Sequence, residues 1–378
     1  MTTTILVDLA LLLFLCRKME NPSSSETDVE EVIASAAGAC ETHSTEFRIG
    51  IDIEVNSDDE EVVCQHYRVR KIENLDRVKN LKKLAIVASC VDRIDGIDKN
   101  NQLEHFEIYQ GLLRRIENIS HLTNLRVVDL SFNKIKRIEG LSTLHQLEKL
   151  YLSNNRISLI ENLDNLKNLK LLELGANRIR KINAPCLGNL TELKELWLGK
   201  NKIENMSDLD GFEFPKLEQL SLQSNRLIHW SENLFSKVAP NLTNVYLGTN
   251  ALTDPGLEVL SGLNPDTLEE FDVSCNRLTQ VPLFPKRMHK LQELWLNDNL
   301  IDSSDSFERL REPVPGLTTI YLERNPVQKQ CPLDYRKTLM ENLPESIEQI
   351  DAVRVPTREL HVTSNPDTFP VKKSILKQ

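Results

Sequence analysis

The sequence predicts an α/β repeat protein: a right-handed, curved solenoid with a parallel β-sheet on its concave face, short 3₁₀ or helical segments on its convex face, and a C-terminal cap. Three observations predict this fold. Leucine and asparagine recur at a nearly constant period along most of the 378 residues, and apolar residues alternate at two-residue spacing before each asparagine. Each unit is also too short to bury its own apolar face, so units must stack and share one continuous core.

The repeat unit is clearest at Leu125, where the pattern Leu-x-x-Val-x-Leu-x-x-Asn runs to Asn133. A period of 20–29 residues with this pattern is the leucine-rich-repeat signature. The central two-residue alternation predicts a short strand whose apolar side chains point inward. The pattern returns at Leu147, Leu169, Leu193, Leu217, Leu242, Leu268, Leu291 and Leu317.

Each unit contains an asparagine at which the chain is expected to turn away from the strand. We expect its amide to lie beneath the turn and to donate to backbone carbonyl groups of adjacent turns. Loss of one such residue should cost about 1–3 kcal/mol, because a buried polar group would be left unpaired. The predicted ladder consists of Asn133, Asn155, Asn177, Asn201, Asn225, Asn250, Asn276, Asn299 and Asn325.

The spacing and charge of the chain predict four segments. Residues 1–63 form an acidic, mostly disordered segment with a short apolar start, and residues 64–325 form about 11–12 repeats. Residues 326–353 form the C-terminal cap, and residues 354–378 form a basic tail. The repeats are regular up to Asn177 and longer beyond it, with insertions that fall after the asparagine, on the convex side.

Charge and composition exclude several partners. The net charge of −10 is concentrated in residues 19–63, which carry thirteen acidic residues and one basic residue, so nucleic acid is disfavoured as a direct partner. The apolar run 5–16 is too short to cross a bilayer and is interrupted by Asp8. Its basic residues follow it, whereas those of a signal peptide come before the apolar run, so no membrane association is expected. The seven cysteines contain no Cys-x-x-Cys pair, which predicts reduced thiols in an intracellular protein.

The residue between the two inward-pointing apolar residues of each predicted strand should point outward from the concave surface. These eleven residues, which we call the concave line, include no lysine or arginine but two of the three tryptophans. Exposed aromatic residues are typical binding anchors, and stacked carboxylates favour a cationic partner. The line predicts a surface for a partner with Arg or Lys side chains and apolar pockets. Its members are Ala85, Glu107, Asp129, Tyr151, Glu173, Trp197, Ser221, Tyr246, Asp272, Trp295 and Tyr321.

No catalytic motif is present. The sequence contains no His-Glu-x-x-His, no Gly-x-Ser-x-Gly and no glycine-rich phosphate-binding loop. Asp129 and Glu173 lie two repeats apart, about 10 Å by strand spacing, which is a poor arrangement for a glycosidase carboxylate pair. The sequence therefore predicts a protein that is not an enzyme and has no cofactor or bound metal.

The repeat unit, together with an N-terminal stretch from His66 to Glu73 and a C-terminal stretch from Tyr321 to Pro326, resembles the leucine-rich-repeat regulatory subunits of protein phosphatase 1, the regulatory subunit 7 family. The resemblance covers about residues 60–353. It implies a monomeric scaffold of the nucleus and cytoplasm whose concave face binds the phosphatase catalytic subunit. The binding positions carried over are Asp129, Tyr151, Glu173, Trp197, Asp272, Glu293, Trp295 and Tyr321. Glu107 and Tyr246 are added from the concave line.

This sequence departs from the family in its longer repeats after Asn177, which leaves a divergent relative with another partner open. The basic tail carries a second feature, since Ser374, Ile375, Leu376 and Lys377 match a short docking motif of phosphatase 1 regulators. Two other functions are open for a protein with this repeat: an adaptor that binds a spliceosomal RNA-binding protein, and an axonemal or cytoskeletal adaptor.

Overall fold

The computed structural model describes residues 45–65, 67–182, 185–330 and 332–356. Contacts within the chain divide it after Glu46, and the described residues lie almost entirely in the part that begins at Phe47. The predicted apolar start at 5–16 and the docking motif at Ser374–Lys377 lie outside the described residues.

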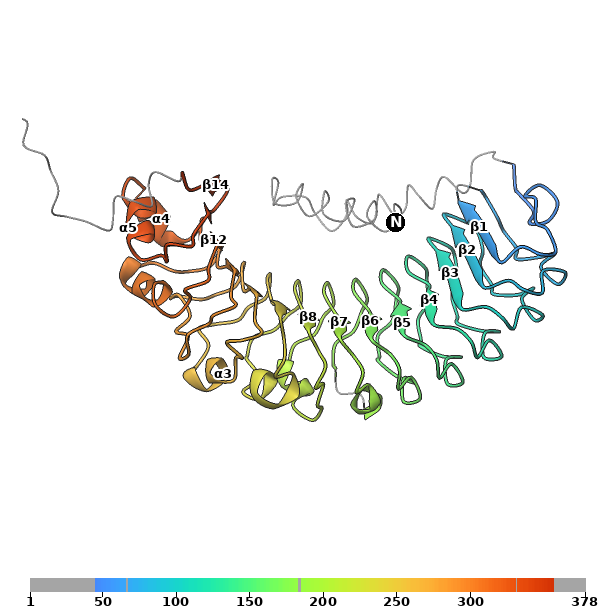
Figure 1. The fold of residues 1–378 in the computed structure, drawn as a ribbon, viewed down its shortest axis with the longest axis horizontal. Coiled ribbons are helices and arrows are strands. Elements are labelled where there is room, and N and C mark those ends of the chain that lie inside the picture. The colour runs from blue at the N-terminus through green and yellow to red at the C-terminus, as the bar shows by residue number, and fades with distance from the viewer. Residues whose placement is uncertain (1–44, 66, 183–184, 331, 357–378) are drawn as a thin grey trace, which may run out of the picture. The chain divides into compact units, whose positions relative to one another are not determined.

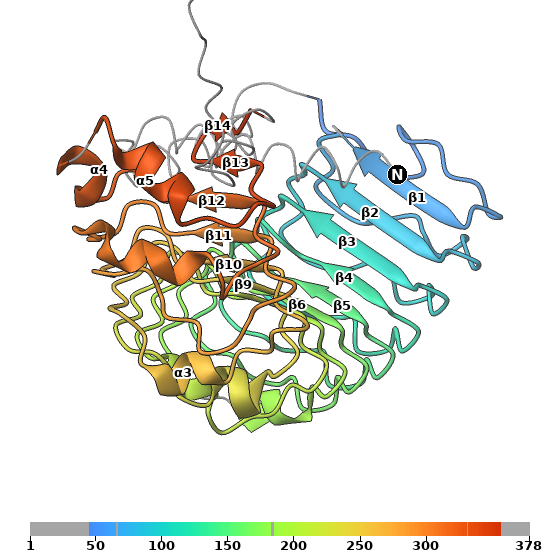
Figure 2. The ribbon, with the colours of Figure 1, turned by 60° about the vertical axis from the view of Figure 1, so that its left-hand side comes forward.

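Within the described residues, fourteen strands form one sheet in which neighbours in sequence are neighbours in space. All adjacent strands are parallel except the last pair, which is antiparallel. Figure 2 shows the strands side by side, and Figure 1 shows them along the inner side of the curved solenoid. They are β1 (Glu61–Gln65), β2 (Lys83–Val87), β3 (His105–Tyr109), β4 (Val127–Asp129), β5 (Lys149–Tyr151), β6 (Leu171–Glu173), β7 (Glu195–Trp197), β8 (Gln219–Ser221), β9 (Asn244–Tyr246), β10 (Glu270–Asp272), β11 (Glu293–Trp295), β12 (Thr319–Tyr321), β13 (Gln349–Ile350) and β14 (Val353–Arg354). The predicted curved solenoid is confirmed.

Short helical elements lie on the outer side of the curve (Figure 1). In the repeats they occur only after Asn177, among the described residues, where the sequence carries its insertions. They are η1 (Pro185–Asn189), η2 (Met206–Leu209), η3 (Leu234–Val238, a single π turn), α3 (Leu257–Ser261) and η4 (Ser304–Leu310). The extra residues fold into turns because they add apolar side chains to the core, such as Met206, Phe235 and Phe307.

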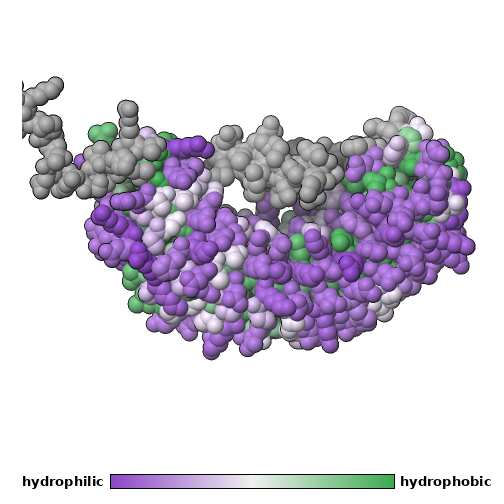
Figure 3. All heavy atoms as spheres, viewed as in Figure 1, coloured by the Kyte–Doolittle hydropathy of each residue, from purple (hydrophilic) through white to green (hydrophobic). Residues whose placement is uncertain are grey.

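The core is a single apolar cluster that extends from Ile49 to Ile350, whereas the face of the solenoid seen in Figure 3 is mostly hydrophilic. The second residue of each strand from β2 to β13 is fully buried, as in Leu150 of β5 and Leu294 of β11, whereas its neighbours on both sides are mostly half-buried. This alternation places the first and third residues of each strand on the concave surface.

The asparagines lie on the inner side of each turn, and their side chains join neighbouring repeats. Oδ1 of Asn155 accepts from the Ile135 backbone N–H at 3.0 Å, and its Nδ2 donates to the carbonyl oxygens of Leu130 at 2.9 Å and Leu152 at 3.1 Å. The other eight repeat this geometry, and the residue before each asparagine has a positive φ between 50° and 62°. The hydrogen bonds therefore hold a turn that is unfavourable for most residues other than glycine, asparagine and aspartate.

A second ladder of residues, which was not predicted from the sequence, lies in the convex turns of the regular repeats. Asn74, Gly96, Asn118, Gly140 and Asn162 recur at 22-residue steps and all have positive φ. The three asparagines each donate from Nδ2 to a carbonyl oxygen of the preceding repeat at 2.7–2.8 Å. At the two glycines the backbones approach closely instead: a Cβ on Gly96 would lie 2.2 Å from a carbonyl oxygen.

The predicted N-terminal boundary at residue 63 is too late. Ile49, Val55 and Val62 are buried in the solenoid core, and Phe47 forms a parallel bridge with Val69. The alternation of apolar residues that produces this first turn is present from Ile49 onward, but the surrounding acidic residues conceal it. The solenoid therefore includes part of the segment that was expected to be disordered.

The last repeat is covered by α4 (Pro326–Gln330), α5 (Tyr335–Glu341), β13 and β14. Asp351 follows Ile350, the register partner of Ile320, and its Oδ1 accepts from the backbone N–H groups of Leu322 at 2.8 Å and Glu323 at 2.9 Å. The Tyr335 hydroxyl donates to Oδ2 of Asp351 at 3.1 Å. The carboxylate therefore binds the Leu322 N–H group, whose counterparts Leu130 and Leu296 donate to a backbone carbonyl oxygen of the next strand.

Among the described cysteines, Cys64, Cys186 and Cys275 are free, and burial raises the pKa of the Cys64 thiol to about 11. Cys90 is disulfide-bonded, which contradicts the expectation of reduced thiols at this position. The expectation rested on separation along the sequence, whereas a disulfide depends on separation in space.

Candidate functional site

The concave surface carries two lines of side chains, because both the first and the third residue of each strand face it. The concave line occupies the third positions from β2 to β12. Basic residues, which are absent from that line, occur at first positions in the N-terminal strands, as in Lys83 and Lys149. From β7 onward, acidic residues hold the first positions of β7, β10 and β11, which are Glu195, Glu270 and Glu293.

An aromatic stack lies near the C-terminal cap. Trp295 of β11 and Tyr321 of β12 are register partners, and their ring centroids are 4.0 Å apart with an interplanar angle of 22°. Nε1 of Trp295 lies 3.4 Å from Oε2 of Glu293, and the Tyr321 hydroxyl accepts from Nε2 of Gln349 at 2.7 Å. The hydrogen bonds at both ends hold the two half-buried rings in place before any partner binds.

A second stack lies over the middle of the sheet. Trp197 of β7 and Tyr246 of β9 are two strands apart, yet their ring centroids are 5.9 Å apart and the rings are nearly parallel, at 21°. The residue between them is Ser221 of β8, whose small side chain leaves room for the rings to meet. Nε1 of Trp197 donates to Oε2 of Glu195 at 3.1 Å, and the Tyr246 hydroxyl donates to Oε2 of Glu270 at 2.7 Å.

The N-terminal strands present carboxylates. Glu107, Asp129, Tyr151 and Glu173 are successive register partners on β3 to β6. Burial raises the pKa of Asp129 to about 6, although its Oδ1 accepts from the Ser131 backbone N–H at 2.9 Å. A cation from a partner would favour the ionised form of these groups.

Asp272 of β10 repeats the geometry of Asp129 in the C-terminal strands. Its Oδ1 accepts from the Ser274 backbone N–H at 2.9 Å, and burial raises its pKa. It lies between Tyr246 of β9 and Trp295 of β11, so a buried carboxyl group separates the two aromatic stacks.

Several concave residues were not found from the sequence. Tyr109 and Phe132 form a third aromatic contact, with centroids 5.0 Å apart, beside Asp129. The acceptors Glu195 and Glu270 and the donor Gln349 also belong to the surface. A signal for Glu195 existed: the triplet Glu-Leu-Trp occurs in both β7 and β11.

The described residues contain no cluster of three or more His, Cys, Asp or Glu side chains that could hold a metal ion. In the same residues no helix is long and apolar enough to cross a membrane. The concave surface is thus an extended sheet face with fixed aromatic rings and carboxylates.

Comparisons with known proteins agree with this fold. A leucine-rich-repeat family model matches residues 111–225. Mouse podocan is 33% identical over 114 residues, and the protein phosphatase 1 regulatory subunit pprA of Dictyostelium discoideum is 37% identical over 65 residues. These matches cover 30% and 17% of the chain, and the chain spans 18% of the length of each relative.

Two solved structures share the fold at low sequence identity. An internalin from Listeria monocytogenes has a TM-score of 0.65 at 20% identity, over 88% of this chain and 92% of its own. A leucine-rich-repeat protein of Leptospira interrogans has a TM-score of 0.59 at 23% identity, over 73% of each chain. The repeated template, the parallel-sheet solenoid and these likenesses agree on a leucine-rich-repeat fold.

Proposed function

We propose that this protein is a non-catalytic scaffold that binds the catalytic subunit of protein phosphatase 1 through its concave face. The likeness to the Dictyostelium phosphatase 1 regulatory subunit supports this partner, although it extends over only 17% of the chain. The resemblance of the repeats to the regulatory subunit 7 family supports it independently of that match. In this proposal the chain is a monomer before it binds and acts in the nucleus and cytoplasm.

The observation that carries the proposal is the pair of aromatic stacks, each hydrogen-bonded to a carboxylate of the same surface. Rigid aromatic rings bury apolar anchors at low entropic cost, and adjacent carboxylates pair with Arg or Lys side chains. The proposed contact residues are Glu107, Asp129, Tyr151, Glu173, Trp197, Tyr246, Asp272, Glu293, Trp295 and Tyr321. Ser374–Lys377 would act as a second, weaker contact.

The test is calorimetric binding of purified phosphatase catalytic subunit to Trp295→Ala. We expect a loss of about 2–4 kcal/mol of binding free energy, the range of a central anchor, with little change in melting temperature because the ring lies on the surface. Trp230→Ala is the matched control: its ring lies away from the concave line, and its Nε1 donates to the Thr253 carbonyl oxygen at 2.8 Å. That variant should bind as the wild type does.

Wild-type affinity in Trp295→Ala would contradict the concave assignment. Deletion of residues 372–378 should weaken binding by only about 1 kcal/mol, since a short tail adds a second valency to a larger interface. Affinity purification tests the partner itself. Recovery of a spliceosomal RNA-binding protein or a cytoskeletal component, with no phosphatase, would replace the partner and leave the scaffold role.

A further inference from the structure

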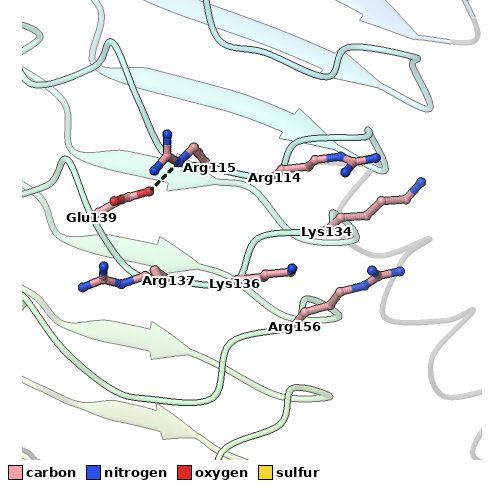
Figure 4. A pocket seen from close by; sticks show the side chains of 7 residues that line it. All are labelled: Arg114, Arg115, Lys134, Lys136, Arg137, Glu139 and Arg156. Carbon is pink, nitrogen blue, oxygen red and sulfur yellow. Dashed lines mark ion pairs between the residues drawn. The ribbon is translucent and has the colours of Figure 1, made fainter.

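A basic groove lies outside the concave line, over the turns that follow β3 to β5. It is open, with a volume of about 510 Å³, and its lining contains six basic residues and one acidic residue. Figure 4 shows Arg114, Lys134 and Arg156 extending toward the same side from successive repeats. The lining residues are Arg114, Arg115, Lys134, Lys136, Arg137, Glu139 and Arg156.

Two kinds of cation line this groove. Arg115 and Arg137 belong to a column of inter-repeat ion pairs: Arg115 lies 3.5 Å from Glu139, and Arg137 lies 3.0 Å from Glu161. In contrast, Arg114, Lys134, Lys136 and Arg156 have no ion pair with any carboxylate of the described residues. The same turns therefore neutralise one column of cations and leave the neighbouring column unpaired.

The unpaired cations continue along the solenoid. The residue after the ladder asparagine is basic in five successive repeats, and we call these residues the basic rail: Lys134, Arg156, Arg178, Lys202 and Arg226. Each backbone N–H of the rail donates to a carbonyl oxygen of the preceding repeat at 2.8–2.9 Å. The backbone hydrogen bonds hold the cations at the strand spacing, so the rail is about 19 Å long.

We propose that the basic rail and its groove bind a short acidic segment, rich in Asp and Glu, of a partner protein. An extended segment advances about 3.3 Å per residue, so about six residues would match the length of the rail. The guanidinium groups of Arg114, Arg156, Arg178 and Arg226 can each bind a carboxylate through two hydrogen bonds. Binding at the basic rail is independent of which protein occupies the concave face.

Two observations favour an acidic peptide over nucleic acid. No aromatic side chain lines the groove, whereas single strands usually stack their bases on aromatic rings. The same repeats carry Glu107, Asp129 and Glu173 on the adjacent concave surface, which would repel a long polyanion. A short acidic segment can follow the rail without crossing these carboxylates.

The experiment measures fluorescence anisotropy of a labelled peptide of six alternating Glu and Asp residues with the full chain. We expect saturable binding that weakens at least tenfold between 20 and 200 mM salt, because exposed ion pairs are screened. Lys134→Glu/Arg156→Glu should weaken it at least tenfold. The matched control is Arg287→Glu/Lys290→Glu, which makes the same charge change at exposed sites of the C-terminal repeats. It should change affinity less than twofold.

Three results would overturn the proposal: no saturable binding, equal losses in the two double variants, or tighter binding of a single-stranded DNA hexamer than of the peptide. Lys134→Gln/Arg156→Gln, which introduces no repulsion, should show a smaller loss in the same direction, and both rail variants should keep the wild-type melting temperature. Phosphatase binding measured on the rail variants separates this proposal from that of the concave face.

Discussion

The repeats before and after Asn177 share one strand geometry and differ on their convex side. In residues 67–177 the convex segments are turns, supported by the second ladder and by the pairs Arg93–Glu117, Arg115–Glu139 and Arg137–Glu161. In residues 178–325 they contain η1 to η4 and α3, and bury phenylalanines. The strands must match because each ladder asparagine bonds to the preceding repeat, whereas the convex segments need only fill the core.

The largest expected difference between the two regions concerns core volume. Phe271 of the C-terminal repeats has ring centroids of Phe235, Phe284 and Trp230 within 6.3–6.4 Å. Phe271→Ala should lower the free energy of unfolding by about 3–5 kcal/mol, and Leu150→Ala, in the regular repeats, by about 2–5 kcal/mol. Chemical denaturation of both variants tests the comparison. An equal or larger loss in Leu150→Ala would show that the aromatic cluster is no tighter than the leucine stack.

The second-largest expected difference is in the contribution of the two ladders to the free energy of unfolding. Asn155→Ala leaves the buried Ile135 N–H and the Leu130 carbonyl oxygen without a side-chain partner, so we expect a loss of about 1–3 kcal/mol. Asn162→Gly should cost about 0.5 kcal/mol or less, because glycine already occupies this position at Gly96 and Gly140 and accepts positive φ. Denaturation midpoints measure both. A loss above 2 kcal/mol in Asn162→Gly would make the second ladder equal to the first.

The buried carboxyl groups predict a pH dependence shared by both regions. The pKa of Asp129 is raised from 3.8 to about 6 in the folded state, and that of Asp272 is also raised. The folded protein therefore binds these protons more tightly than the unfolded chain, and their contribution to stability grows as pH falls from about 6 toward 4.

At pH 7, Asp129→Asn should stabilise the protein by about 1–2 kcal/mol, and Asp272→Asn should act in the same direction. Urea denaturation between pH 4 and 8 measures this. Asp76→Asn, at an exposed site, is the control and should change nothing. A destabilised Asp129→Asn at pH 7 would mean that its hydrogen bond to Ser131 outweighs its burial.

A small effect is also expected at the turn before each ladder asparagine. Thr249 is β-branched and has a φ of 56°, whereas the equivalent residue of the regular repeats, Asn154, has a φ of 53° and belongs to a type that tolerates it. Thr249→Asn should therefore stabilise by about 0.5–1 kcal/mol, and Asn154→Thr should destabilise by a similar amount. Melting temperatures of the two variants would reveal opposite shifts. Shifts of the same sign would exclude backbone strain as their cause.

Much of the fold could be predicted because the local sequence of each repeat determines its strand and its turn. The two-residue alternation around Leu150 sets a strand with one buried face, and Asn155 sets the turn, so both follow from local pattern. The first turn, at Ile49–Val55, escaped because its burial depends on packing against the next repeat at Val69, and its acidic composition is typical of disorder.

The outward positions on the concave face followed from strand periodicity, but their contacts did not. That Trp197 and Tyr246 stack across Ser221 depends on ring orientation and on the space left by a small side chain two strands away. The hydrogen bonds of Glu195 and Glu270 depend on the same packing. Their binding role stays a prediction, as does that of the tail motif.

By itself the sequence determined the repeat, its strands, its asparagine ladder and the absence of cations from the concave line, because these depend on residue spacing within one unit or between equal units. Only the tertiary structure decided the two aromatic stacks, the alternating second ladder, the hydrogen bonds of Asp351 at the C-terminal cap, and the division between paired and unpaired cations on the flank. Each of these depends on how side chains of different repeats meet at a spacing of about 4.8 Å. The distances between these side chains and their orientations are set by packing between repeats, so the order of residues within one repeat does not determine them.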